Sequence, residues 1–146
     1  MMKVSIREKT FNPFHEIENY EKNLRVTGKY GATAMFVGSM RDFNEGRKID
    51  SMFLEYYPEM TEKHLYEILN DAKKKFTLLD LLLLHRVGQI EVGDHIVLIA
   101  TWSEHRKEAF DSCRFIMEEL KTRAPFWKKE KTSTGDHWVK KNTPGF

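Results

Sequence analysis

Residues 81–102, LLLLHRVGQIEVGDHIVLIATW, hold the pattern that decides the fold. Two apolar runs in this stretch, Leu81–Val87 and His95–Trp102, flank the turn-like segment Glu91–Asp94. Short apolar runs bounded by turn residues are typical of buried strands. The stretch therefore predicts two strands with a turn between them.

A long helix is expected directly after these strands. Ser103 is its expected cap, with Glu104 in the first turn, where the helix dipole favours an anion. Because Pro125 disfavours the helical conformation in the residue before it, the helix should end near Arg123. Its core face is expected to comprise Phe110, Cys113, Met117 and Leu120, with Ala109 and Ile116 beside them.

Apolar spacing and capping residues also predict the elements before residue 81 and after residue 123. Gly31–Met40, GATAMFVGSM, is mostly apolar and predicts a buried strand, which we expect to form a hairpin with Ile49–Tyr57. Pro58 opens a second amphipathic helix. The other expected elements are a strand at Lys3–Arg7, a helix at Pro13–Leu24 capped by Asn12, and a final hairpin of Phe126–Lys131 with His137–Lys141.

Strand hairpins placed between helices argue for an α+β fold with a mostly antiparallel sheet and three helices. We expect an arrangement like the α/β-hammerhead. The length of 146 residues fits one domain, residues 1–146.

Composition and motifs exclude several classes of protein and indicate the cellular compartment. The single cysteine excludes an internal disulfide framework and a Cys-rich zinc site. The histidines lack paired metal spacing, so we predict no metal, and no dinucleotide or P-loop motif is present to indicate a cofactor. No apolar run is long enough to span a bilayer, and the first residues lack the apolar core of a secretory signal. A cytoplasmic protein is expected.

Charge is unevenly distributed along the chain. The net charge is +2, but residues 121–146 contain seven basic and two acidic residues. A local cationic surface favours an anionic partner or substrate. A solvated lysine-rich end is the alternative.

Three sequence features could carry chemistry. Gly38–Arg41 takes a buried strand into a loop that ends in arginine, where backbone amides and a guanidinium could hold an anion. His105 and Arg106 lie at the expected helix start, a second place for an anion. Lys121 and Lys128 lie on either side of Pro125, so a chain reversal could bring their amines together. Each feature also has a structural interpretation without chemistry. Arg41 could be a surface arginine of a hairpin loop, and His105 and Arg106 could be solvated residues at the helix start. Lys121 could simply complement the helix dipole at the C-terminal end.

Six stretches, taken in order, resemble the large catalytic subunit of molybdopterin synthase. They are GATAMFVGSMR (31–41), LEYYPEM (54–60), HRVGQIEVG (85–93), SEHRKEAF (103–110), LKTRAPFWKKE (120–130) and GDHW (135–138). The resemblance covers most of the chain, and the run from residue 120 to 130 is its most specific part.

The resemblance implies a sulfurtransferase of molybdenum cofactor biosynthesis. Enzymes of that family make the dithiolene of molybdopterin by adding two sulfurs to cyclic pyranopterin monophosphate. A small ubiquitin-like subunit carries each sulfur as a thiocarboxylate on its C-terminal Gly-Gly tail. The catalytic subunits form a homodimer within a heterotetramer, with no cofactor, nucleic acid or membrane involved.

The resemblance also implies the site residues. Its two catalytic lysines fall on Lys121 and Lys128, which also bind substrate, and the sequence leaves open which lysine has which role. The remaining substrate-binding positions fall on Ser39, Met40, Arg41, His105, Arg106, Lys129 and Glu130.

A non-enzymatic function is the alternative to this interpretation. The alternating aromatic residues and lysines of Phe126–Lys131 could form a basic groove for an acidic peptide tail or RNA. The low net charge and the distance in sequence of Arg41 and His105 from this stretch argue against it.

Overall fold

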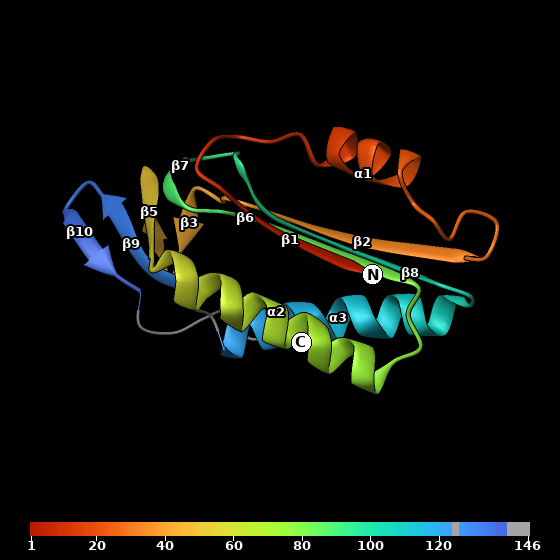
Figure 1. The fold of residues 1–146 in the computed structure, drawn as a ribbon. Coiled ribbons are helices and arrows are strands. Elements are labelled where there is room, and N and C mark those ends of the chain that lie inside the picture. Colours follow the sequence, from red (N-terminus) through yellow and green to blue (C-terminus); the bar gives the residue numbers. More distant parts are fainter. Residues whose placement is uncertain (124–125, 140–146) are drawn as a thin grey trace.

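The computed structural model describes residues 1–123 and 126–139, which form two small sheets and three helices (Figure 1). The first sheet has the order β1-β6-β8-β2. Its strands are β1 (Met2–Arg7), β6 (Asp80–Arg86), β8 (His95–Ser103) and β2 (Ala32–Ser39). Only β1 and β6 pair in parallel, whereas β6–β8 and β8–β2 are antiparallel.

The second sheet has the order β10-β9-β5-β7, and its pairs are all antiparallel. Its strands are β10 (Gly135–Trp138), β9 (Phe126–Thr132), β5 (Ser51–Tyr56) and β7 (Gly88–Glu91). A two-stranded ribbon of β3 (Phe43–Asn44) and β4 (Arg47–Lys48) joins the two sheets along the chain. The ribbon turns at Glu45 and Gly46, both with positive φ, as a type I′ two-residue hairpin loop requires.

The helices cover both faces of the first sheet (Figure 1). α2 (Pro58–Lys75) and α3 (Arg106–Thr122) lie on one face, and α1 (Pro13–Lys22) lies on the other. β6 is buried along its whole length because it lies between two other strands and between these helix layers. Leu81 and Leu83 pack with α2 and α3, whereas Leu82 and Leu84 pack on the side of α1. The α+β class and the three helices are as expected.

Two expectations about the strand at Gly31–Met40 are wrong. β2 is not buried, because it lies at the edge of the first sheet, and Met35 and Phe36 are each about 40 % exposed. It also forms no hairpin with β5. A bulge at Gly38/Ser39 shifts the register, so that Ser39 pairs with His95 of β8. The Met40 amide then donates to the Asp94 carbonyl, and the chain leaves the first sheet there.

The start of α3 also differs from expectation. Ser103 ends β8 and its hydroxyl donates to the His105 carbonyl, so the helix begins at Arg106 with His105 in the cap position. Glu104 therefore lies before the helix. Phe110 does not belong to the core face, since it is 68 % exposed. The expected end near Arg123 is confirmed.

The final hairpin is confirmed in the described residues, with β9 paired to β10. The expected second strand extends to Lys140 and Lys141, which lie outside the described residues. β7 was not expected as a strand, since the sequence predicts only a turn between the two apolar strands and assigns Glu91 to that turn. None of the helices in the described part of the chain is long and apolar enough to cross a membrane.

Candidate functional site

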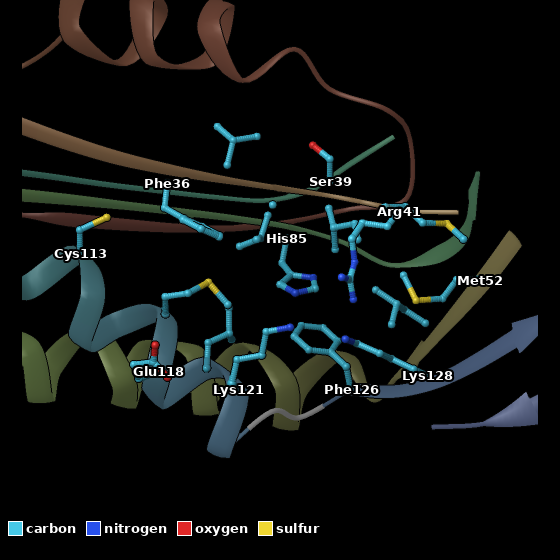
Figure 2. A pocket seen from close by; sticks show the side chains of 18 of the residues that line it. Phe36, Ser39, Arg41, Met52, His85, Cys113, Glu118, Lys121, Phe126 and Lys128 are labelled. Carbon is cyan, nitrogen blue, oxygen red and sulfur yellow. The ribbon is translucent and has the colours of Figure 1, made fainter. Parts of the chain in front are cut away.

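A cavity of about 850 Å³ lies between the end of β2, the last turns of α3 and the inner face of the second sheet. At one end its lining includes Arg41, Lys121 and Lys128, together with His85 (Figure 2). Glu130 belongs to the same end, since its carboxylate raises the pKa of Lys128. We call this end the lysine pocket. The rest of the cavity is mostly apolar and runs along β2 and α3 past Phe36, Met117 and Cys113, with the ion-paired Arg114 and Glu118 also in the lining. Six of the expected site residues line the cavity: Ser39, Met40, Arg41, Lys121, Lys128 and Glu130.

Lys121 is positioned by the end of α3. The next turn is fixed to α2, because the guanidinium of Arg123 lies 2.7 Å from the Asp71 carboxylate and 3.2 Å from that of Glu119. Leu120, beside Lys121, is buried in the main core. The final turn of α3 is thus anchored on both sides of Lys121, which directs this side chain into the lysine pocket (Figure 2).

Strand alternation in β9 sorts its lysines between two faces. Lys128 pairs with the buried Leu54, and Glu130 pairs with the buried Met52, so both face the cavity. Lys129 lies on the opposite face, since successive side chains of a strand point to opposite sides. There its amine is 3.5 Å from the Asp136 carboxylate and lies over the Trp138 ring. Lys129 is therefore not brought to the lysine pocket.

Burial and neighbouring cations change the acidity of Lys128. Its pKa is lowered from 10.5 to about 8, chiefly because burial disfavours the charged form, and further because Lys121 and Arg41 are positive. Glu130 acts in the opposite direction. Lys128 can therefore exchange a proton close to neutral pH, as an acid–base group in catalysis must.

The strand end at Gly38–Arg41 was expected to hold an anion with backbone amides and a guanidinium. In the structure it contributes the guanidinium of Arg41 to the cavity. Arg41 points into the lysine pocket, whereas the Ser39 hydroxyl points away from the lysines and is 2.9 Å from His95 Nδ1 (Figure 2). The Met40 amide is used by Asp94, and the Met40 side chain is buried. Gly38 lets β2 approach β8 closely, because a Cβ there would lie 2.8 Å from a Val97 methyl.

Glu130 is the acidic group of the lysine pocket. The side-chain amide of Asn44, on β3, donates to both oxygens of its carboxylate, at 3.0 and 3.2 Å. The short ribbon between the sheets is thereby fixed to β9 at the cavity. The sequence predicts residues 41–48, which include Asn44, only as a polar, glycine-containing loop.

His105 and Arg106 are not brought to the cavity. Both are exposed at the start of α3, at the opposite end from Lys121. Sixteen residues of helix correspond to roughly 24 Å at 1.5 Å per residue. One chain alone therefore does not combine the expected His-Arg pair with the expected lysines.

His85 is a lining residue that sequence reasoning missed. It is the last inward-facing residue of the leucine-rich strand β6, and its ring stacks on Phe126 with centroids 4.0 Å apart. A polar residue that interrupts an apolar strand pattern was the available signal.

Cys113 lies in the apolar part of the cavity. It is buried, and burial raises the pKa of its thiol to about 11, so it is a thiol and not a thiolate near neutral pH. In the described part of the chain, no group of three or more His, Cys, Asp or Glu residues is arranged to hold a metal ion.

Comparison with known proteins identifies the family. Residues 10–123 match the family model described as "MoaE protein". This chain belongs to the MoaE family. A molybdopterin synthase catalytic subunit from Pseudomonas aeruginosa is 46 % identical over 139 residues, which span 94 % of this chain and 90 % of that protein. The expected family and the class of enzyme, a transferase of molybdopterin synthesis, are confirmed.

Solved MoaE-family structures have the same fold. The molybdopterin biosynthesis MoaE protein from Burkholderia ambifaria has a TM-score of 0.78 and 42 % identity, and the match covers 95 % of this chain and 89 % of that one. Molybdopterin synthase from Staphylococcus aureus has a TM-score of 0.81 at 29 % identity, with coverage of 92 % and 95 %.

Proposed function

We propose that the lysine pocket is the active site at which this catalytic subunit of molybdopterin synthase adds sulfur to cyclic pyranopterin monophosphate. The sulfur arrives as the C-terminal thiocarboxylate of a small ubiquitin-like subunit, in the cytoplasm. The convergence of Arg41, Lys121 and Lys128 in one cavity is the observation that carries the proposal. Guanidinium and ammonium groups suit both the phosphate of the substrate and the thiocarboxylate of the donor.

Each group of the lysine pocket has a chemical task in this reaction. Arg41 holds the phosphate, and Glu130 keeps the amines oriented while limiting the positive charge around them. One lysine meets the incoming thiocarboxylate, and the other assists proton transfer as the cyclic phosphate opens. The lowered pKa of Lys128, about 8, fits it for proton transfer.

The sulfur is supplied by the partner, not by this chain. Its only cysteine is buried and protonated, so it is unsuited to carry sulfur. A Gly-Gly tail is suited to a narrow entry because it has no side chains. We therefore propose that the tail of the small subunit reaches Lys121 and Lys128 through the cavity.

We also propose that two copies of this chain share each site. β2 is an edge strand of its sheet in the described part of the chain, and it presents Met35 and Phe36 to solvent, with Phe110 of α3 nearby in the same cavity lining. An exposed edge strand with apolar side chains is suited to pairing with another chain. A two-fold dimer that joins two β2 strands in antiparallel fashion would cover these residues.

Such a dimer would complete the lysine pocket. The start of β2 lies beside the start of α3, since Ala32 pairs with Ser103, and the end of β2 lies beside Lys121. Antiparallel pairing of two β2 strands places the start of one beside the end of the other. The partner subunit's His105 and the partner subunit's Arg106 would then approach the lysine pocket of this chain, and the reverse would hold by symmetry.

The test is dithiolene formation from cyclic pyranopterin monophosphate with a thiocarboxylated small subunit. Two neighbouring lysines of β9 provide matched variants. Lys128→Ala should lower turnover by at least ~10²-fold, the lower range for an acid–base group. Lys129→Ala should stay within about two-fold, because Lys129 faces away from the lysine pocket. Equal activities of the Lys128→Ala and Lys129→Ala variants would contradict the proposed site.

The role of the tail is tested separately. A small subunit that lacks its last two residues should support no turnover.

A further inference from the structure

His85 is an uncharged side chain placed among several charged ones. From β6 it lines the same cavity as Lys121 on α3, Lys128 and Glu130 on β9, and Arg41 after β2. Arg114 and Glu118 of α3 also line the cavity and pair with each other at 2.9 Å. His85 is only 7 % exposed and occupies the apolar face of β6 that packs on α2 and α3. A polar ring at such a position calls for a specific partner on each nitrogen.

The ring is held in one orientation by two contacts. It stacks on Phe126, with an angle of 16° between the rings. Its Nδ1 lies 2.7 Å from the Arg86 carbonyl oxygen. A carbonyl oxygen can only accept, so Nδ1 carries the hydrogen. In a neutral ring Nε2 then carries the lone pair and can only accept.

The ring is neutral near pH 7. The pKa of His85 is lowered from 6.5 to about 4. Burial is the main cause, the positive charges of Lys128 and Lys121 act in the same direction, and the hydrogen bond to the Arg86 carbonyl acts against them. Both lysines point toward the region of this ring (Figure 2). A lysine amine has donors to offer, and an uncharged nitrogen lone pair accepts a hydrogen bond without adding a counter-charge.

We propose that His85 is a positioning residue for the lysine pocket, whose Nε2 lone pair accepts an N–H from the lysine pair and so orients Lys128 toward the substrate. Glu130 supplies an acceptor that carries a charge, whereas His85 supplies one that does not. An anionic substrate can therefore enter a pocket whose lysines are already aligned and are not fully neutralised. This inference rests on the proposed function of the lysine pocket.

Two substitutions separate the two ring nitrogens. His85→Asn can retain the donor to the Arg86 carbonyl but has no atom at the Nε2 position, whereas His85→Gln places an amide oxygen near that position. His85→Asn should lower kcat roughly 10- to 100-fold, the range for misaligned catalytic groups, with KM for the pterin within about two-fold. His85→Gln should recover most of that loss.

The pH profile distinguishes positioning from simple packing. An acceptor at Nε2 stabilises the ammonium form of Lys128, so its loss in His85→Asn should move the inflection assigned to Lys128 to lower pH. A packing role would leave the inflection unchanged. Folded His85→Asn and His85→Gln variants that both retain parent kcat and the parent inflection would overturn the proposal.

A spectroscopic measurement keeps the proposal testable without activity. Nitrogen-15 NMR of the histidine rings in the parent chain should show His85 with hydrogen on Nδ1 at pH 7. Its pKa should rise more in Lys128→Ala than in Lys121→Ala, because Lys128 has the larger effect on the ring. Hydrogen on Nε2, or no response to either substitution, would refute the positioning role. A parent chain with these NMR properties but no sulfur transfer would instead refute the proposed function.

Discussion

The two ends of α3 both carry residues that the family resemblance assigns to the active site, yet their surroundings differ sharply. Lys121, near the C-terminal end, lies in a cavity with another lysine and an arginine, next to a turn tied to α2. His105 and Arg106, at the N-terminal end, are exposed and line no part of that cavity. One end of α3 therefore contributes to a cavity within this chain, whereas under the proposed two-fold dimer the other end would contribute to the cavity of a second chain.

The largest expected effect comes from removing a lysine at the formed end. Lys121→Ala should lower sulfur transfer by at least ~10²-fold, because it removes one of the two amines in the lysine pocket. Lys107→Ala is the matched control at the other end of the same helix, where Lys107 is exposed and pairs with Asp111. Its turnover should stay within about two-fold of the parent, and both variants should unfold near the parent temperature. Comparable losses in both variants would remove the distinction between the two ends.

The cost of burying a cation at the formed end can be measured as stability. Lys128→Met keeps an unbranched side chain without charge, so its free energy of unfolding at pH 7 should exceed that of the parent by roughly 1 kcal/mol. Below pH 8, Lys128 is protonated in both the folded and the unfolded chain, so the parent has the lower free energy of unfolding throughout this range. Between about pH 8 and 10.5 the folded protein releases this proton before the unfolded chain does, so the parent should gain stability relative to the variant. Denaturant titrations at pH 7 and 10 measure this, and a gap that widens with pH would contradict the lowered pKa.

The smallest expected effect concerns the apolar half of the cavity. Cys113→Ala should lower the free energy of unfolding by about 1 kcal/mol, since the thiol is buried against the sheet. Turnover should remain within about two-fold, because the sulfur arrives on the small subunit. Loss of sulfur transfer in a folded Cys113→Ala protein would mean that this thiol takes part in the chemistry.

Much of the fold was predictable because its strongest patterns are local. The apolar strands at 81–87 and 95–102 and the helix end before Pro125 all depend on neighbouring residues. The pairing of β2 was not predictable in this way. Its apolar residues resemble a buried strand, although part of this apolar surface lies at an open sheet edge.

The candidate site was predictable in composition more than in geometry. The resemblance selected Arg41, Lys121 and Lys128, and the structure brings all three together. It also selected Lys129, but the pleat of β9 turns that residue to the other face. His85 and Asn44 depend on contacts between distant segments, and no local pattern reports those contacts.

Mixing two inactive chains tests most directly whether the two ends of α3 meet across a dimer. Arg106→Ala and Lys121→Ala chains with different affinity tags are co-expressed, and mixed dimers are isolated through both tags. In a shared-site dimer, one pocket carries both lesions and the other carries none. Up to half of the parent turnover per dimer should therefore return. Verified mixed dimers that are as inactive as either variant alone would contradict the account, because each pocket would then be built from a single chain.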